Sequence, residues 1–165
     1  MQGIILPPNA KVSAVRTLPG NYVIDREGDV AIVIDLTERS DQHMGLLTLT
    51  GARAMESRLL GGRHGLPKPD VIGLEFDEIE VVAKRATRTR MDDLKIGSII
   101  VAETGTHIVA KSWDENADGP MYVNVHTGKL SYVNEAIVFS VTGWTIRGLR
   151  AAKVVAEIGP ATPSA

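Results

Sequence analysis

Short apolar runs alternate with turn residues along most of the chain. The runs are three to six residues long, rich in Val and Ile, and bounded by Gly, Asp, Asn or Thr. β-Branched runs between turn residues are typical of strands. The pattern predicts strands over residues 22–24, 30–34, 45–50, 79–82, 98–101, 107–110, 121–125 and 137–141. We therefore expect a mainly β protein.

Two stretches carry a helical pattern. Residues 52–60 have the composition of a short helix, and Gly61-Gly62 provides a stop signal. We therefore interpret residues 52–69 as a short helix or a loop inserted between strands. Residues 148–158 fit a helix and an edge strand equally well, so both interpretations stay open.

An internal repeat is the most informative feature of the pattern. A shift of 77 residues aligns five identical residues without a gap: Gly20 with Gly97, Gly28 with Gly105, Met44 with Met121, and Thr50-Gly51 with Thr127-Gly128. Chance similarity between Gly-punctuated strand pairs is the alternative explanation. The constant offset favours duplication of one supersecondary unit. It predicts two tandem β-barrel-like or sandwich-like modules, a form that limits exposed sheet edges.

The repeat divides the chain into five parts. They are an N-terminal arm at 1–10, a first module at 11–83 with the insertion 52–69, a basic linker at 84–90, a second module at 91–147, and a C-terminal segment or arm at 148–165. Each module is near the size at which a single domain is marginally stable. We therefore expect the modules to pack on each other or on a partner.

Composition narrows the classes of function. The 165 residues contain 44% hydrophobic residues, 18 Lys and Arg against 20 Asp and Glu, and no Cys. The apolar content is that of a folded domain, and the absence of Cys excludes disulfide frameworks and Cys-ligated metal. A net charge of -2 provides no general attraction to nucleic acid. We predict no signal peptide and no transmembrane segment, because the apolar runs are short.

Catalytic motifs are missing from the sequence. It has no G-x-S-x-G elbow and no phosphate-binding G-x-x-x-x-G-K motif, and its four His lack metal-ligand spacing. Carboxylates such as Asp25, Glu27, Asp29 and Asp35 are interpreted as solvent-facing residues of strands and turns. We predict a protein that is not an enzyme and has no cofactor and no metal, with a hydrolase as a minor alternative.

One turn resembles half of a calcium loop. Asp114, Asn116 and Asp118, followed by Gly119, match the first half of the D-x-N-x-D-G pattern. The twelfth position is Val125 instead of Glu, so the bidentate ligand is missing. A polar hairpin tip is the preferred interpretation, and calcium binding is the alternative.

A cationic run lies at the joint between the modules. Lys84, Arg85, Arg88 and Arg90 could contact phosphates of a nucleic acid. The run lacks interleaved aromatic residues for base stacking. A solvated linker is therefore the preferred interpretation.

The two ends of the chain are predicted to contact partners. Apolar residues beside prolines suit arms that become ordered on an assembly. The candidate interface residues are Ile4, Ile5, Leu6, Val154, Val155 and Ile158.

The second module carries a family resemblance. Residues 91–98, 106–109 and 121–130 resemble a pattern of small bacteriophage-encoded β-proteins, which open with a "D-L-K-x-G-D" turn and later carry an "N-x-V-x-x-x-T-G" strand and turn; here Ser98 stands in place of the final Asp of the opening turn. The resemblance implies a phage or prophage origin and a non-catalytic role. We expect an oligomeric structural or accessory protein of a phage particle, located in the virion or host cytoplasm. Its partners would be capsid or tail proteins, with capsid decoration favoured. A nucleic-acid-binding small barrel and a calcium-dependent binder are the alternatives.

Overall fold

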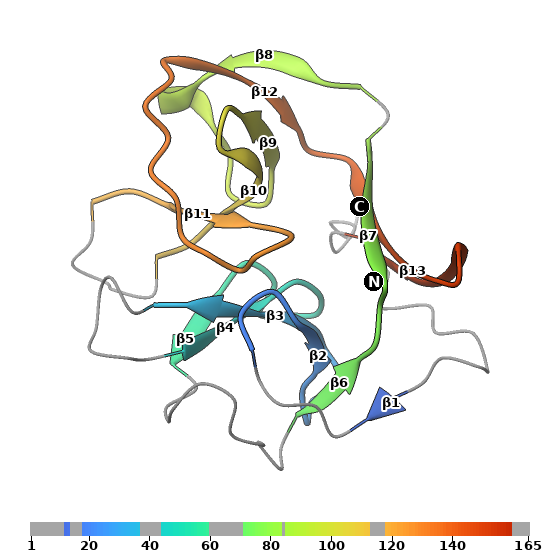
Figure 1. Cartoon of the computed structure of the whole chain (residues 1–165). Coiled ribbons are helices and arrows are strands. Elements are labelled where there is room, and N and C mark those ends of the chain that lie inside the picture. Colours follow the sequence, from blue (N-terminus) through green and yellow to red (C-terminus); the bar gives the residue numbers. More distant parts are fainter. Residues whose placement is uncertain are drawn as a thin grey trace.

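The computed structural model describes residues 12–13, 18–36, 44–59, 71–83, 85–112 and 118–159. These residues are mainly β, which confirms the predicted class, and they form three antiparallel sheets (Figure 1). The elements are β1 (Val12–Ser13), β2 (Tyr22–Ile24), β3 (Val30–Asp35), β4 (Met44–Thr48), β5 (Ser57–Leu59), β6 (Ile72–Leu74), β7 (Glu78–Ala83), β8 (Thr87–Arg90), the 3-10 turn η1 (Met91–Asp93), β9 (Ile99–Ala102), β10 (Gly105–Ala110), β11 (Met121–Asn124), β12 (Ile137–Val141), β13 (Trp144–Arg150) and β14 (Lys153–Ile158). The sheet orders are β1-β6-β2-β3-β4-β5, β11-β10-β9-β12-β8 and β14-β13-β7.

The six-stranded sheet is built around the meander β2–β3–β4. Tyr22 pairs with Ile32, and Ile32 pairs with Leu47, so the three side chains form one row on one face. All three are buried in the central hydrophobic cluster. Their neighbours Val23 and Val33 point to the other face and pack in a separate buried cluster. The continuous apolar run of β3 is thus explained by burial on both faces.

The five-stranded sheet contains a second meander, β9–β10–β11. Ile108 pairs with Ile99 on one side and with Val123 on the other, and this row also lies in the central cluster. Ile100 and Val109 point to the opposite face and form a smaller cluster. The strands β12 and β8 extend this sheet beyond β9.

The three-stranded sheet joins the other two. Trp144 of β13 is buried in the central cluster, and its indole Nε1–H donates to the carbonyl of Gly97 at 2.7 Å. Ile158 of β14 lies in the same cluster and is fully buried. At Gly148 the β13–β14 register shifts, and a Cβ there would overlap the ring of Phe76. The close packing of the Phe76 ring on β13 therefore depends on glycine at this position.

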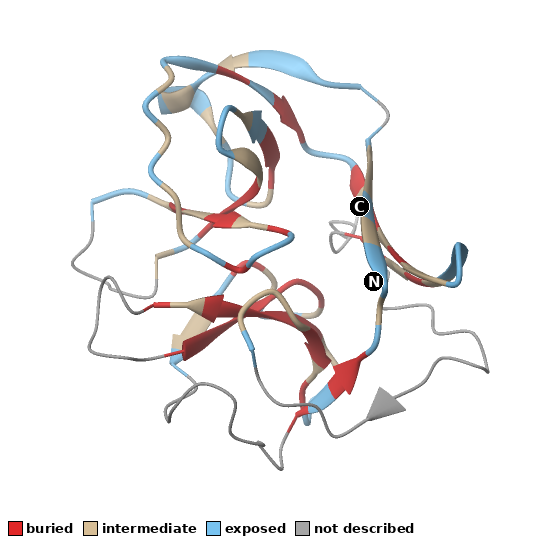
Figure 2. Ribbon diagram, in the orientation of Figure 1, coloured by how far each residue is buried: buried red, intermediate tan, exposed pale blue. Residues whose placement is uncertain are grey.

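Both meanders contribute to one core, and backbone hydrogen bonds join them (Figure 2). The N–H of Asp35 donates to the carbonyl of Gly128 at 3.0 Å, and the N–H of Lys111 donates to the carbonyl of Met55 at 3.0 Å. The buried Tyr22 hydroxyl donates to the carbonyl of Val125 at 2.9 Å. The central cluster is therefore shared by the two segments predicted as modules, whose independent folding stays a prediction.

The predicted barrel form is wrong. None of the three described sheets closes on itself, and each ends in two different strands. The apolar faces are instead buried by packing sheets against one another around the central cluster.

Of the two interpretations of residues 52–60, a short helix or a loop, the helix is wrong for the described residues. Residues 52–55 form a turn, and Met55 has a left-handed φ of 68°. Ser57–Leu59 then pairs with β4 as strand β5. Pairing with the buried strand β4 outweighs the helical propensity of the segment. Residue 60 and the rest of the predicted insertion lie outside the described residues.

The C-terminal ambiguity is resolved in favour of strands. Residues 144–158 form the hairpin β13–β14, and its turn places Ala151 and Ala152 at φ values of 50° and 60°. Two residues with positive φ suit the right-handed twist of a two-residue hairpin. The Asp77 carboxylate accepts a hydrogen bond from the N–H of Ala151 at 2.7 Å, which holds the turn.

The predicted linker contains a strand. Thr87–Arg90 forms β8, which pairs with β12 at the edge of the five-stranded sheet. Apolar content gave no signal for this strand, because its residues are only Thr and Arg.

Candidate protein interface

Half-exposed apolar side chains gather on one face of β9 and β12. Val101 pairs with Phe139, and Ile137 lies two residues before Phe139 on the same face. Their exposed fractions are 50%, 51% and 48%. Side chains this large are usually buried, so a group of three on one face marks a candidate interface.

The exposure arises because the strands extend past the core. Ile99 and Val141 lie on the same face as Val101 and Phe139, one step further in, and both are buried in the central cluster. Two residues further out, the covering sheets end and the face is open. The same face of β9 and β12 is thus buried at Ile99 and Val141 and half-exposed at Val101 and Phe139.

Two arginines border the apolar group. Arg88 of β8 pairs with Phe139, and Arg90 pairs with Ile137, so both arginines lie on the same face as the apolar residues. Both are exposed, as Figure 2 shows for most of β8. Arg90 approaches the Asp92 carboxylate at 4.0 Å, but both side chains are largely exposed and such pairs contribute little. We call Arg88, Arg90, Val101, Ile137 and Phe139 the outer face.

The chemistry of the outer face is that of a protein contact. Aromatic residues and arginine are enriched in interfaces, since both bury large areas and arginine also hydrogen-bonds in a fixed plane. Among the described strands β8 is an edge of its sheet. Edge strands can accept a further strand from a partner.

The described cations of the predicted run lie on different parts of the surface. Lys84 lies outside the described residues. Alternation along β8 puts Arg88 and Arg90 on the outer face, whereas Arg85 lines a pocket together with Thr87 and Thr89. These cations therefore do not form one continuous stripe, as tracking a nucleic-acid backbone requires.

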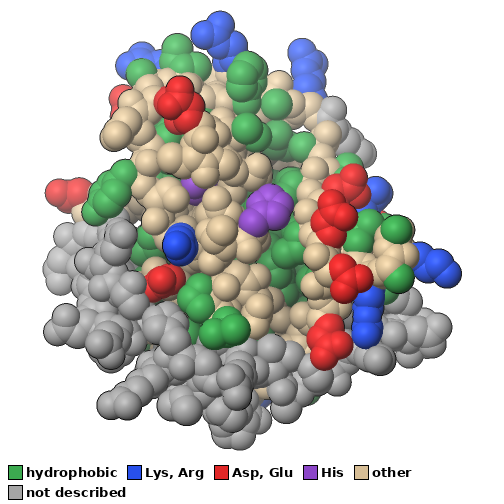
Figure 3. Space-filling view, in the orientation of Figure 1, with side chains coloured by type: hydrophobic (Ala, Val, Ile, Leu, Met, Phe, Trp, Pro, Cys, Tyr) green, Lys and Arg blue, Asp and Glu red, His purple; other side chains and the backbone are tan. Residues whose placement is uncertain are grey.

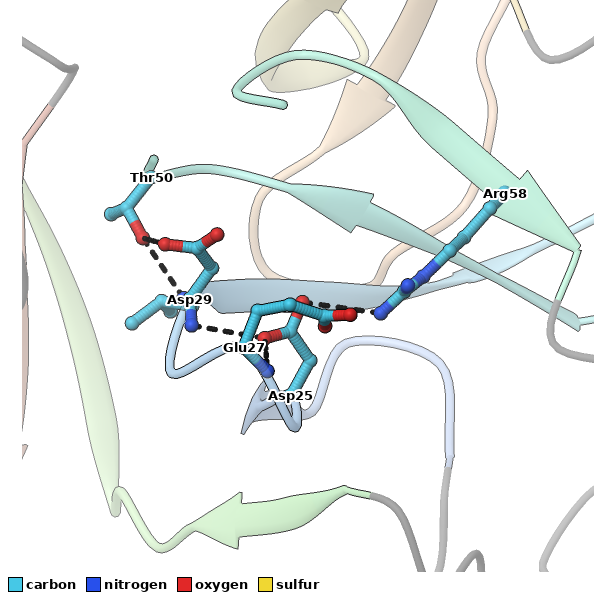
Figure 4. A network of polar contacts seen from close by, with 6 residues as sticks. Asp25, Glu27, Asp29, Thr50 and Arg58 are labelled. Carbon is cyan, nitrogen blue, oxygen red and sulfur yellow. Dashed lines mark hydrogen bonds and ion pairs between the residues drawn. The ribbon is translucent and has the colours of Figure 1, made fainter. Parts of the chain in front are cut away.

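The carboxylates of the first hairpin hold the fold. Asp25 is only 7% exposed, so its predicted solvent-facing position is wrong. Its Oδ1 accepts from the N–H groups of Glu27 and Asp29 at 3.0 and 2.9 Å, and its Oδ2 accepts from Arg58 at 3.1 Å (Figure 4). Thr50 hydroxyl contacts Asp29 and accepts from a backbone N–H. The network closes the hairpin turn.

A groove of about 420 Å³ lies between the six-stranded and three-stranded sheets. Tyr22 and Phe76, whose ring centroids are 5.9 Å apart, line it together with Glu78 and the exposed His126. The exposed histidine in the middle of Figure 3 lies opposite a row of acidic side chains. Within the described residues, no hydrogen bond joins the His126 ring to a carboxylate.

The other histidine of the second module is buried. The His107 side chain has Nδ1 at 3.0 Å from the carbonyl of Gly105 and Nε2 at 3.3 Å from the Thr104 hydroxyl. A neutral ring that donates from Nδ1 and accepts at Nε2 satisfies both contacts. Burial lowers the pKa of His107, opposed by the Gly105 carbonyl and the Glu135 charge. The ring is therefore a structural group.

This lowered pKa predicts a pH dependence of stability. The unfolded chain binds a proton at His107 near pH 6.5, whereas the folded chain binds it only at lower pH. The stability contributed by the neutral ring is complete above pH 6.5 and declines as pH falls toward the folded pKa. Thermal unfolding between pH 5 and pH 8 should show this decline in the wild type and a shallower decline in His107→Gln. Parallel curves for the two proteins would contradict the assignment.

The other predicted sites are only partly described. Asp114 and Asn116 lie outside the described residues, and Asp118 is exposed. The described residues contain no group of three or more His, Asp or Glu that could hold a metal ion.

The six candidate interface residues near the two ends of the chain have different outcomes. Ile4, Ile5 and Leu6 lie outside the described residues. Val154 is 44% exposed and Val155 is half-buried, so both are accessible on β14. Ile158 packs in the central cluster and is fully buried, so it is a core residue of this chain.

None of the three apolar residues of the outer face was predicted as an interface residue. A usable signal was present at residues 137–139, where apolar residues occupy three successive positions of one strand. Such a run requires cover on both faces of the sheet. The sequence alone does not say whether that cover comes from this chain.

Comparison of the chain with family models, curated proteins and solved structures finds no match. Within the described residues, no helix has the length and apolar character to cross a membrane.

Proposed function

We propose that this protein is a non-enzymatic subunit of a larger assembly and docks through the outer face onto a neighbouring protein. The observation that carries the proposal is the group of half-exposed Val101, Ile137 and Phe139 beside Arg88 and Arg90. Two cations at the border fit a partner surface that is apolar at its centre and acidic at its rim.

The assembly we propose is a bacteriophage particle, with the chain as a capsid decoration or head–tail subunit. This step rests on the resemblance of residues 91–130 to small phage β-proteins. The open sheets with their several edge strands also support a subunit role, since neighbours can cover edges that the chain leaves open.

We further propose that the chain arose by duplication of a three-stranded meander. The row Tyr22–Ile32–Leu47 corresponds to the row Ile99–Ile108–Val123 at offsets of 77, 76 and 76, because the first hairpin of the second meander is one residue shorter, and both rows face the central cluster. The three glycine pairs of the repeat all have left-handed φ. The Asn21-to-Leu18 backbone bond at 3.1 Å corresponds to the Ser98-to-Lys95 bond at 3.1 Å.

The cross-links between the meanders support the same proposal. The Asp35–Gly128 and Lys111–Met55 hydrogen bonds are similar in place: one donor ends β3 and the other directly follows β10, and each acceptor lies in the turn after the third strand of the other meander. Such reciprocal contacts are expected of two related units that pack about an approximate twofold axis.

Sedimentation tests the docking proposal. In lysates of the cells that carry the gene, the wild-type chain should sediment with particles in a sucrose gradient. Phe139→Asp and Arg88→Glu should leave the chain at the top of the gradient, because each puts a negative charge against an acidic rim. The matched control is Leu59→Asp, which changes a residue that is 49% exposed on β5, away from the outer face.

Three outcomes would contradict the proposal. They are a wild-type chain that sediments as a monomer, a Leu59→Asp chain released as completely as Phe139→Asp, and release of the wild type by nuclease. The last outcome would favour the nucleic-acid alternative instead.

A further inference from the structure

A polar pocket of about 210 Å³ lies on the face of the five-stranded sheet opposite the outer face. Its floor is made by alternate residues of β8 and β12 and by the residue before β9. Thr87 pairs with Ser140, and Thr89 lies beside them on the same face. The lining residues are Arg85, Thr87, Thr89, Asp93, Lys95, Ser98, Ser140 and Thr142.

Two of the five hydroxyls are used within the floor. The Thr89 hydroxyl donates to the carbonyl of Thr87 at 3.2 Å and shares a hydrogen bond with the Ser140 hydroxyl. Because Thr89 has one proton and gives it to Thr87, Ser140 must donate to Thr89. Neither proton is then free for a ligand.

The other three hydroxyls remain as donors. Within the described residues, the hydroxyls of Thr87, Ser98 and Thr142 have no hydrogen-bond partner. Ser98 is only 2% exposed, and a buried hydroxyl without a partner is costly. A ligand that accepts hydrogen bonds in the pocket would satisfy it.

Charge selects the class of ligand. Arg85 and Lys95 border the hydroxyls, and a guanidinium with an ammonium favours an oxyanion. The third ionisable group of the pocket, Asp93, would repel a fully deprotonated anion. A carboxylate can only accept hydrogen bonds, so it favours an anion that still carries a proton.

We propose that this pocket binds inorganic phosphate in its protonated form. Arg85, Lys95 and the three free hydroxyls donate to the phosphate oxygens, and Asp93 accepts from the P–OH group. Sulfate has the same shape but no proton at neutral pH, so the same carboxylate disfavours it. The pocket lies across the sheet from the outer face, and the proposal does not depend on docking.

Amide chemical shifts of the full chain during titration with sodium phosphate test this proposal, with sodium chloride at matched ionic strength as the reference. We expect saturable shifts confined to the residues that line the pocket, and weaker binding of sodium sulfate. Arg85→Gln should weaken phosphate binding by about tenfold or more, because a charge-assisted contact is lost. Ser98→Ala should weaken it by a smaller factor.

Two further variants make the test specific. Arg88→Gln removes an arginine from the other face of the same strand and should leave phosphate binding unchanged. Asp93→Asn should reduce the preference for phosphate over sulfate, which a purely structural role of Asp93 would not do.

Three results would overturn the proposal: shifts that do not saturate, shifts that chloride reproduces, or shifts that reach half-saturation at the same phosphate concentration in Arg85→Gln as in the wild type. Competition by a single-stranded oligonucleotide for the same amides would also overturn it, since a phosphodiester has no P–OH proton and would indicate a nucleic-acid site.

Discussion

Gly128→Ala is expected to destabilise the protein by about 3–5 kcal/mol, because strain and overlap act together. Gly128 has a left-handed φ of 69°, and a Cβ there would lie 2.3 Å from the Val33 carbonyl oxygen and 2.4 Å from the Gly20 nitrogen. Both obstacles are backbone atoms of the other meander, so no side chain can move aside. The loss is a large part of the stability of about 5–15 kcal/mol that is usual for a domain.

Two glycine variants separate strain from overlap. Gly28 has a φ of 84° with open space around it, so Gly28→Ala should cost about 1–2 kcal/mol from conformation alone. Gly143 has open space and no left-handed φ, so Gly143→Ala should change stability by less than about 0.5 kcal/mol. Urea unfolding of the three variants measures how much each one lowers the free energy of unfolding, and we expect the losses to decrease in the order Gly128→Ala, Gly28→Ala, Gly143→Ala. Equal costs for Gly128→Ala and Gly28→Ala would contradict the close approach of the meanders.

Trp144→Ala is the second large effect that we expect, at about 3–5 kcal/mol. Trp144 is 2% exposed and fills the place where the three-stranded sheet meets the central cluster. The smaller change Trp144→Phe keeps most of the packing but leaves the Gly97 carbonyl without its indole donor. It should cost about 1–3 kcal/mol.

Phe139→Ala is the matched control for the tryptophan variants. It also removes a large aromatic side chain, but one that is 51% exposed on the outer face. It should lower the free energy of unfolding, measured in urea, by less than about 1 kcal/mol. A Trp144→Ala protein as stable as Phe139→Ala would show that the third sheet is not held by this contact.

The β class was predictable because burial leaves a direct trace in the sequence. Runs such as residues 30–34 are apolar at every position, and the structure buries them on both faces. The strand β8 was not predictable on this basis, since Thr and Arg carry no apolar signal and the strand exists through its pairing with β12. The helix predicted over 52–60 failed for the same reason, because pairing with β4 decides the conformation of 57–59.

The candidate sites were less predictable than the fold. Four nearby cations suggested one binding run, but Arg85 lines the polar pocket whereas alternation along β8 puts Arg88 on the outer face. The pocket draws hydroxyls from residues 87, 98 and 142, which only sheet pairing brings together. Spacing along one sequence does not encode such long-range register. The alternating hydroxyls at 87 and 89 and at 140 and 142 were a usable local signal.

The reciprocal hydrogen bonds between the meanders have a consequence for biosynthesis. When residues 18–59 leave the ribosome, the amide of Asp35 and the carbonyl of Met55 still lack their acceptor and donor, which lie 93 and 56 residues downstream at Gly128 and Lys111. Tyr22, Ile32 and Leu47 of the nascent first meander stay exposed to solvent until the second meander has been synthesised. Co-translational folding of this chain is therefore a late event, completed near the end of synthesis.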